Sequence, residues 1–304
     1  MRAALFPGQG SQTVGMGREL YQGSRAAREV LDRAEATLPG LLSLMFEGPE
    51  ETLTLTENAQ PALLAVGVAA FSAYQESGGS TPQAAAGHSL GEWTAHVVAG
   101  TLALEDALRL VRLRGRFMQE AVPVGEGTMA AVLKLDRPAI EEALAGIPGV
   151  WIANLNAPGQ TVISGRREAV EKAASRLKER RARVVFLNVS APFHTPLMAE
   201  AARRLAAELE PVPFADPALP VYSNVTAEPV TRGDEAKRLL IEQITAPVRW
   251  VEVLENLHRS GIRNFLEFGV GNVLTGLVRR TLKDVYAQEV TTPEAAKEVA
   301  GWNP

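Results

Sequence analysis

The sequence has no cysteine and few histidines, and each shortage removes a class of chemistry. Without cysteine the chain can form neither a disulfide framework nor a thiolate metal site, and a cysteine nucleophile is excluded. The same absence suits a reducing compartment, so we expect a cytoplasmic protein. The four histidines, at positions 88, 96, 194 and 258, lack the spacing of metal ligands, and we expect no metal.

Long apolar runs and an excess of positive charge are also missing. No apolar run reaches the roughly 18 residues that a membrane span requires. The stretch before the first apolar strand is too short for a signal peptide. The formal net charge of −4 lacks the positive excess of nucleic-acid-binding proteins. We therefore expect neither a membrane nor a nucleic acid as a partner.

The order of the apolar segments divides the chain into two units. The 304 residues are 46% hydrophobic, which is enough for one large packed unit and a smaller one. Up to residue 124, and again from residue 190, short apolar strands alternate with helices. Residues 125–189 follow the order βαββαβ, which is the ferredoxin-like arrangement. We expect an α/β fold in which a core of residues 1–124 and 190–304 carries an inserted ferredoxin-like subdomain, residues 125–189.

The expected elements follow from apolar periodicity and from proline and glycine breaks. In the core we expect strands over residues 3–6, 84–86, 221–223 and 264–268, and helices over 25–38, 60–75, 92–98, 104–119, 196–209 and 272–283. In the subdomain we expect strands over 129–135, 150–155, 161–164 and 184–189, and helices over 138–144 and 168–180. Beyond about residue 286 the sequence is polar and predicts a terminal helix or a loose tail.

The most informative motif is Gly87-His88-Ser89-Leu90-Gly91, a serine bracketed by glycines between an apolar stretch and a helical pattern. An α/β fold uses this arrangement to lift a nucleophilic hydroxyl out of a sharp turn, and the glycines let neighbouring backbone approach closely. The amide of Leu90 would then lie at a helix N-terminus, directed at any oxyanion formed beside Ser89. On its own, the motif fits a catalytic serine and an ordinary turn about equally.

A serine nucleophile needs a base within hydrogen-bond reach. His88 adjoins Ser89, so its side chain points away from the apex of the turn. His96 lies two helical turns further along a helix face, and His258 lies at the polar end of a helix. His194 stands in a proline-bracketed loop between a strand and a helix, where a base can be held stiffly. By elimination we predict His194 as the partner of Ser89; the alternative is a histidine that caps a helix.

Arg114 is a cation in apolar surroundings. Leucine and valine precede it on a predicted helix, and glycine and phenylalanine follow. A guanidinium in such a place needs a planar anion, and a carboxylate in bidentate contact is its natural partner. That carboxylate could belong to a substrate. From the residues alone, an internal ion pair with a glutamate is the slightly better interpretation.

Taken together, six short motifs resemble malonyl-CoA:acyl-carrier-protein transacylases of fatty-acid synthesis along nearly the whole chain. Each motif is short, but their joint order is very specific. The resemblance implies an α/β-hydrolase-like core with an inserted ferredoxin-like subdomain, in agreement with the order of elements. The motifs are Phe6-Pro7-Gly8-Gln9-Gly10-Ser11-Gln12, Gly87-His88-Ser89-Leu90-Gly91-Glu92, Arg114-Gly115, Ser164-Gly165, Phe193-His194 and Val273-Leu274-Thr275-Gly276-Leu277.

The resemblance assigns roles to the residues that would carry the reaction. Ser89 matches the acylated nucleophile, and His194 matches its general base and later general acid. Arg114 matches the residue that pairs with the free malonyl carboxylate. Gln9 and Leu90 match the positions whose backbone amides form the oxyanion hole.

Further positions match residues around the substrate. Gln60 corresponds to a glutamine near the acyl pocket, and Asn154 to an asparagine that touches the substrate or the pantetheine arm. Phe193 would narrow the pocket where an α-methyl group would sit. In this family a backbone carbonyl orients the histidine, and we expect it to come from the segment Pro247-Val248-Arg249-Trp250.

The implied enzyme is an [acyl-carrier-protein] S-malonyltransferase. Malonyl would pass from malonyl-CoA to Ser89, and then to the pantetheine thiol of acyl carrier protein, with no cofactor apart from the coenzyme A thioester substrate. A serine hydrolase such as a thioesterase is an alternative, but it leaves Arg114 and the inserted subdomain without a purpose. A non-catalytic carrier-binding subunit is another alternative, and it leaves Ser89 without one.

Basic residues crowd the second half of the expected subdomain in a chain that is acidic overall. The carrier proteins of the resembled family are small and acidic, so one hypothesis is a docking surface. A solvated helix with intrahelical ion pairs explains the same pattern equally well. The resemblance also favours a monomer. The basic residues are Arg166, Arg167, Arg176, Lys178, Arg180, Arg181 and Arg183.

Overall fold

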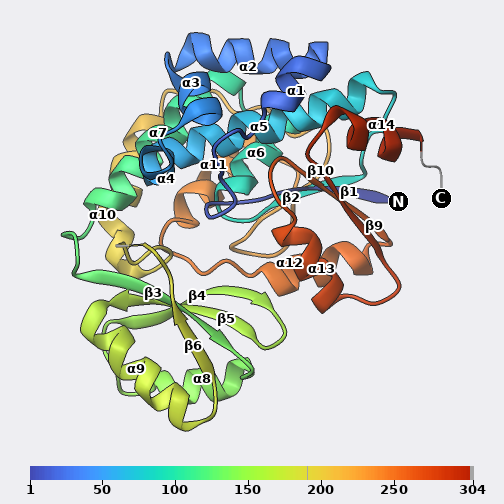
Figure 1. The fold of residues 1–304 in the computed structure, drawn as a ribbon. Helices are drawn as coiled ribbons and strands as arrows, with labels where there is room; N and C mark the ends of the chain where they lie inside the picture. Colours follow the sequence, from blue (N-terminus) through green and yellow to red (C-terminus); the bar gives the residue numbers. More distant parts are fainter. Residues whose placement is uncertain (190, 302–304) are drawn as a thin grey trace.

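The computed structural model describes residues 1–189 and 191–301 and builds them around two sheets (Figure 1). The larger sheet has the strand order β10-β9-β1-β2-β7-β8, and its neighbouring strands run parallel except for β8 against β7. These strands span Arg2–Phe6 (β1), Ala84–Gly87 (β2), Val221–Tyr222 (β7), Pro229–Val230 (β8), Asn264–Phe268 (β9) and Tyr286–Val290 (β10).

Helices cover both faces of the larger sheet, so its central strands β1, β2 and β9 are buried at every position. Side chains of a strand alternate between faces. Ala4 and Phe6 of β1 therefore pack into one hydrophobic core, and Ala3 and Leu5 into another. The first core lies under α2 (Arg25–Thr37), α5 (Thr56–Glu76), α6 (Leu90–Val98) and α7 (Leu104–Glu120), and the second under α12 (Trp250–Arg259) and α13 (Val273–Thr281).

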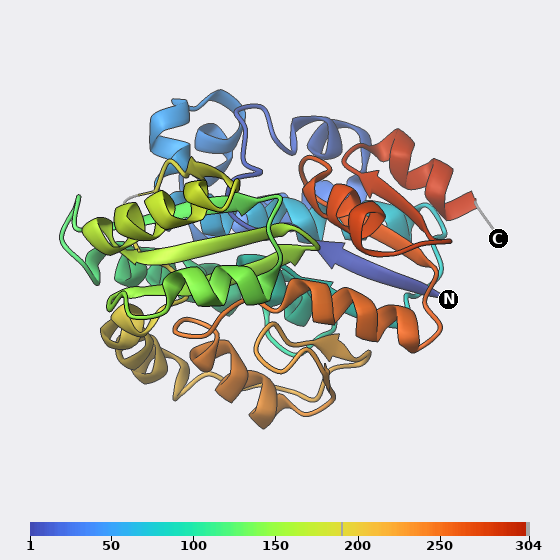
Figure 2. The same ribbon diagram turned by 90° about the horizontal axis from the view of Figure 1, so that it is seen from below.

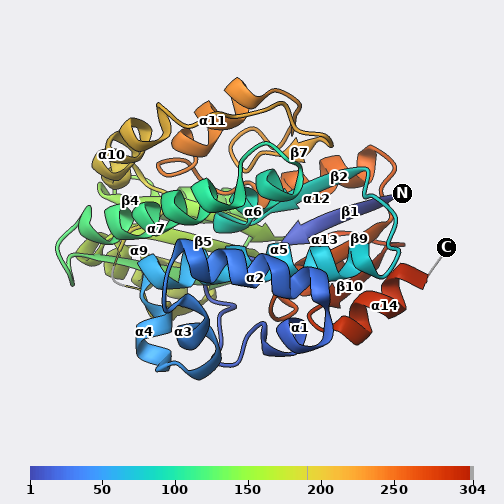
Figure 3. The ribbon, with the colours of Figure 1, turned by 90° about the horizontal axis from the view of Figure 1, so that it is seen from above.

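Helix α5 is central to the first core, with buried residues on every side. Figure 3 shows α2, α5 and α7 lying side by side across that face. Shorter helices complete the larger unit. They are α1 (Arg18–Gly23), α3 (Leu41–Glu47), α4 (Glu50–Thr54), a 3₁₀ turn (Pro196–Met198), α10 (Ala199–Leu209), α11 (Gly233–Glu242) and α14 (Pro293–Gly301).

The smaller sheet is antiparallel throughout, with the strand order β4-β5-β3-β6. Two helices cover its outer face, as Figure 2 shows, and enclose a separate hydrophobic core. The side chain of Asp136 caps the first of these helices by accepting a hydrogen bond from the Ala139 amide at 3.3 Å. In chain order the elements are β3 (Gly127–Leu133), α8 (Arg137–Leu144), β4 (Val150–Ala157), β5 (Gln160–Arg166), α9 (Arg167–Glu179) and β6 (Arg183–Phe186).

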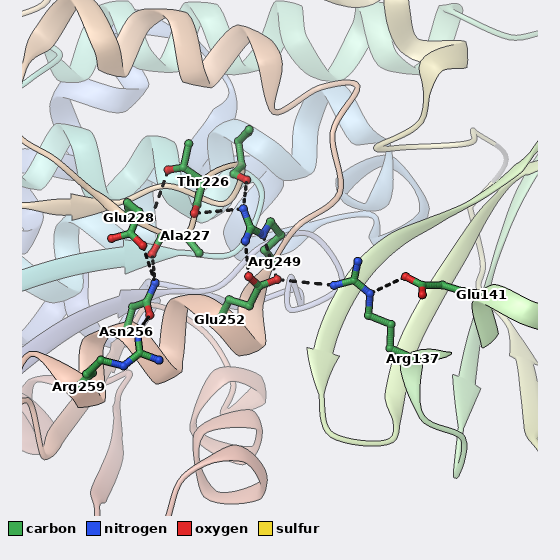
Figure 4. A network of polar contacts seen from close by, with 10 residues as sticks. Arg137, Glu141, Thr226, Ala227, Glu228, Arg249, Glu252, Asn256 and Arg259 are labelled. Carbon is green, nitrogen blue, oxygen red and sulfur yellow. Dashed lines mark hydrogen bonds and ion pairs between the residues drawn. The ribbon is translucent and has the colours of Figure 1, made fainter. Parts of the chain in front are cut away.

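Backbone pairing and ion pairs join the smaller sheet to the larger unit. Val248 donates to the Ala153 carbonyl at 2.8 Å and accepts from the Leu155 amide at 2.9 Å, which extends the edge strand β4. Figure 4 shows a second junction, where Arg137 of α8 lies 3.8 Å from Glu252 of α12. Glu252 also pairs with Arg249, whose guanidinium binds loop carbonyls of the larger unit.

Most expected elements are confirmed within a few residues, and the C-terminal segment is the main correction. The expected terminal helix is confirmed as α14, but the strand β10 that precedes it was not expected. Strand β10 lies at the edge of the sheet and buries only Ala287 and Val290, too few for an apolar pattern. The last subdomain strand ends at Phe186, three residues early. Ser190, the expected start of the second core segment, and residues 302–304 lie outside the described ranges.

Candidate active site

Ser89 sits in a strained turn between β2 and α6. Its φ of 52° lies in the left-handed region, which a residue with a side chain rarely adopts. Gly91 permits the turn, because a Cβ at this position would lie 1.9 Å from the Phe6 carbonyl oxygen. The side chain of Asn224 forms hydrogen bonds with the backbone of this turn. Its Oδ1 accepts from the Ser89 amide at 2.7 Å, and its Nδ2 donates to the Gly87 carbonyl at 2.8 Å.

His194 lies within reach of the serine hydroxyl, 2.8 Å from Nε2 to Ser89 Oγ. Its Nδ1 lies 2.9 Å from the carbonyl oxygen of Gln243. Since a carbonyl only accepts, Nδ1 carries the proton and Nε2 is free to accept from Ser89. Burial and, after it, the positive charge of Arg114 lower the pKa of His194 to about 3. The imidazole is therefore neutral, as a general base must be.

The carbonyl that orients His194 corrects one expectation. It belongs to Gln243 and not to residues 247–250. Gln243 is the C-cap residue of α11, and the last carbonyls of a helix have no acceptor role within it. The backbone amide and carbonyl of Val248 instead form hydrogen bonds with strand β4.

Arg114 reaches the same hydroxyl from α7, with only 1% of its surface exposed. It donates from Nη1 to Gln60 Oε1 at 2.8 Å, and from Nη2 to Ser89 Oγ at 3.1 Å and to Gln243 Oε1 at 2.9 Å. No salt bridge of the described residues includes Arg114, so the predicted alternative, an internal ion pair with a glutamate, is not found. Burial lowers its pKa to about 10, which keeps the guanidinium charged at neutral pH.

Gln9 and Leu90 line the same cavity as Ser89. Leu90 is the first residue of α6, and the first amides of a helix have no intrahelical acceptor. Gln9 follows β1, and its side chain is anchored by donating to Thr56 Oγ1 at 3.1 Å. Neither backbone amide donates to a protein acceptor within residues 1–189 and 191–301.

One cavity of about 450 Å³ gathers every residue that the sequence predicts for the site. It lies where the two units meet, since Asn154 comes from β4 and Ser89 from the larger unit. A neighbouring cavity of about 660 Å³ shares part of its lining, including Gln9 and Leu187. The predicted residues in the first cavity are Gln9, Gln60, Ser89, Leu90, Arg114, Asn154, Phe193 and His194.

The remaining histidines have other contacts. Nε2 of His88 lies 2.7 Å from Oδ1 of Asn156, so the residue beside the serine contacts the smaller sheet. His96 is fully buried in the core beside Thr101, and His258 is half-buried at the end of α12. Among residues 1–189 and 191–301, no group of three or more metal-binding side chains is placed to hold an ion. No helix in these ranges is long and apolar enough to cross a membrane.

Sequence reasoning missed three residues that shape the site: Glu92, Asn224 and Gln243. Glu92 is fully buried, and burial raises its pKa to about 7. A carboxylate in a helix that has no other acidic or basic residue except a histidine is a signal that could have identified it. Asn224 follows a buried strand, which is a weaker signal. Nothing local marks Gln243, because its contacts with Ser89 and Glu92 span about 150 positions of sequence.

Comparisons with known proteins identify the family of the chain. The family model described as acyl transferase domain matches residues 4–303. The malonyl CoA-acyl carrier protein transacylase of Bacillus subtilis (strain 168) is 47% identical, with 96% of this chain and 94% of that protein covered. The protein of the same name from Escherichia coli (strain K12) is 43% identical, with 96% of each covered.

Solved structures give the same result. A malonyl-transacylase solved in complex with its type II PKS acyl-carrier protein has a TM-score of 0.95 and 40% identity, with 98% of both chains covered. The malonyl CoA-acyl carrier protein transacylase of Coxiella burnetii has a TM-score of 0.94 and 41% identity, with 98% of this chain and 96% of that chain covered. The chain therefore belongs to the acyl transferase domain family and, within it, to the malonyl CoA-acyl carrier protein transacylases.

Proposed function

We propose that this chain transfers malonyl from malonyl-CoA to the pantetheine thiol of acyl carrier protein, in fatty-acid synthesis, through a malonyl ester on Ser89. One observation carries the proposal. The Ser89 hydroxyl lies between a neutral base, His194 Nε2 at 2.8 Å, and a buried cation, Arg114 Nη2 at 3.1 Å. A base beside the hydroxyl serves acyl transfer in general, and the cation serves an acyl group that is itself an anion.

In the first half-reaction His194 takes the proton of Ser89 as Oγ attacks the thioester carbonyl. The amides of Gln9 and Leu90 stabilise the oxyanion, since both are free to donate and one heads a helix. When the tetrahedral intermediate collapses, the C–S bond breaks and the coenzyme A thiolate leaves with the proton from His194. The malonyl group then remains on Ser89 as an ester.

The second half-reaction runs the same steps with a different thiol. His194 takes the proton of the pantetheine thiol, and the thiolate attacks the malonyl ester. The C–O bond to Ser89 then breaks, and His194 returns its proton to Oγ. Each half-reaction begins and ends with a neutral imidazole, which gives a ping-pong scheme.

Arg114 selects the malonyl group by binding its free carboxylate. Its present partners are neutral amide oxygens of Gln60 and Gln243, so its charge is not cancelled by a protein anion. Phe193 borders the acyl group and restricts its width. Asn154 contacts the substrate or the pantetheine arm from the side of β4.

The finer organisation of the chain is part of the same proposal. We assign residues 1–124 and 190–304 to an α/β-hydrolase-like core, and residues 125–189 to a ferredoxin-like subdomain. Support comes from the strand order β4-β5-β3-β6, which has the arrangement of a βαββαβ unit. We also propose that the protein acts as a cytoplasmic monomer without a cofactor.

The carrier protein is proposed to dock on the basic residues of the smaller unit. Three of these cations already have partners. Arg180 pairs with Glu142, Arg176 donates to the carbonyls of Ala143 and Ala145, and Arg167 donates to that of Gly125. The other four are exposed and form no side-chain hydrogen bond or ion pair with the described residues, which makes them the better candidates for an acidic partner. They are Arg166, Lys178, Arg181 and Arg183.

Intact-protein mass spectrometry tests the proposed reaction. Incubation with malonyl-CoA should add one malonyl mass, located on the peptide that contains Ser89, and the label should persist until carrier protein is supplied. Ser89→Ala should remain unlabelled. Rapid release of free malonate would favour a hydrolase. Transfer to the carrier by Ser89→Ala at the wild-type rate would exclude the serine mechanism.

A further inference from the structure

The buried carboxylate of Glu92 has no part in the proposed reaction, yet it lies three residues from Ser89. Its Oε2 accepts from the Asn224 amide at 3.0 Å and from Gln243 Nε2 at 2.7 Å. Its Oε1 has no partner among the described residues. A carboxylate is costly to bury, even when it is partly hydrogen-bonded. The residues that Glu92 contacts therefore indicate its role.

Gln243 connects Glu92 to Arg114. A side-chain amide has a donor end and an acceptor end. Since the carboxylate oxygen accepts, Nε2 of Gln243 faces Glu92, and Oε1 of Gln243 then faces the guanidinium, 2.9 Å from Nη2. The same Nε2 donates to the Ser89 carbonyl at 3.0 Å. If the amide turned over, its NH₂ would meet the guanidinium donor to donor.

We propose that Glu92 is a positioning residue for malonyl selection: it fixes the orientation of the Gln243 amide and, through it, that of the Arg114 guanidinium. The inference rests on the proposed function. It explains why the Glu92 carboxylate is connected to Arg114 through the side chain of Gln243 and not by direct contact. In direct contact it would neutralise Arg114, whereas through an amide it orients Arg114 and leaves the charge for the substrate.

This role requires an acceptor at Oε2 and does not require a negative charge. A proton on Oε1, which has no partner, leaves Oε2 able to accept both hydrogen bonds. The raised pKa of Glu92, about 7 because of burial, is compatible with either state. Glutamine at this position offers the same acceptor in neutral form.

The test compares how fast Ser89 is acylated by malonyl-CoA and by acetyl-CoA in single-turnover mass measurements. Glu92→Ala should lower the malonyl-to-acetyl ratio by about tenfold or more, the worth of one hydrogen bond to a charged group. Glu92→Gln should stay within about threefold of the wild-type ratio. Arg114→Ala sets the floor of the scale, because it removes the cation itself.

Two further variants separate positioning from folding. In a Gln243→Leu background, which should itself lower the ratio, Glu92→Ala should have no additional effect. Glu267→Gln changes another buried carboxylate, one that caps α13, and should leave the ratio unchanged. A wild-type ratio in Glu92→Ala or in Gln243→Leu would overturn the inference, as would equal losses in Glu92→Gln and Glu92→Ala. Failure of the wild type to form malonyl-Ser89 would instead overturn the proposed function.

Discussion

Burial shifts the titrating groups around Ser89 in directions that suit the proposed chemistry. It lowers the pKa of His194 to about 3 and that of Arg114 to about 10, because both lose water around their charged forms. It raises the pKa of Glu92 to about 7 for the same reason. At neutral pH the Ser89 hydroxyl therefore lies between an uncharged imidazole and a charged guanidinium.

The depressed pKa of His194 predicts an unusual pH profile. Its neutral form persists as the pH falls through 6.5 and is lost only near 3. The rate of malonyl-Ser89 formation at low malonyl-CoA should therefore show no half-fall near pH 6.5 in quenched-flow measurements between pH 5 and 8. Arg114 and His88 both contribute to the depression. A substrate carboxylate bound to Arg114 cancels the effect of its positive charge, so the pKa of His194 should be higher in the enzyme–substrate complex. The acidic limb of the kcat profile should therefore lie at higher pH than that of the kcat/KM profile. A midpoint near 6.5 in kcat/KM would contradict the assignment.

At the scale of elements, the junction of β2 and α6 depends on backbone contact. The start of α6 packs directly on the end of β1, where the absence of a Cβ at Gly91 allows the helix to approach. The first turn of α6 can then direct the Leu90 amide at the pocket. The close approach of α6 to β1, which a side chain at position 91 would prevent, therefore orients the proposed oxyanion hole.

Gly91→Ala should disrupt this junction. The new Cβ would lie 1.9 Å from the Phe6 carbonyl oxygen, so α6 must shift away from β1. We expect the free energy of unfolding to fall by at least about 1–3 kcal/mol, measured by urea denaturation, together with a loss of Ser89 acylation. Gly276→Ala is the matched control, because a Cβ there meets nothing within 4 Å. In the interior of α13 it should stabilise by about 0.5–1 kcal/mol. Equal stability of the two variants would contradict the close-packing argument.

At the scale of the whole molecule, two units share one pocket, and the inner face of the smaller sheet packs into the core of the larger unit. Asn154 stands on β4 of the smaller unit, while Ser89, Arg114 and His194 belong to the larger. Backbone pairing at Val248 and the hydrogen bond between His88 and Asn156 tie the units together close to the nucleophile. The proposed docking surface and one wall of the pocket therefore belong to the same smaller unit.

Charge reversal on the smaller unit tests where the carrier docks. Arg181→Glu combined with Arg183→Glu should raise KM for carrier protein and leave KM for malonyl-CoA unchanged, because only the acidic partner meets this surface. The difference from wild type should shrink as salt is added. The matched control is Arg259→Glu with Lys283→Glu, which makes the same charge change on the larger unit. If both pairs raise KM for the carrier equally, the effect is one of net charge and the docking surface lies elsewhere.

The features that were predicted correctly are those that a few neighbouring residues encode. The glycine-bracketed serine, the proline-bracketed His194 and the apolar strands each carry their own signal within a few residues. The β10 strand was missed because an edge strand with two buried residues has no apolar pattern. The carbonyl that orients His194 was expected from residues 247–250 and comes instead from Gln243, because helix α11, which ends beside Gln243, was not predicted. The role of the Gln243 carbonyl depends on contacts that form only in the folded chain, and no residue near it in the sequence predicts them.

Asn224 has a consequence for when the enzyme becomes competent during synthesis. The residue that braces the turn at Ser89 follows it by 135 positions, and Gln243 follows by 154. A nascent chain that already contains the whole serine motif still lacks the clamp that holds its backbone at φ 52°. Competence for acylation should thus arise only after Asn224 and Gln243 have been synthesised, so a chain that ends between the motif and Asn224 should not be acylated.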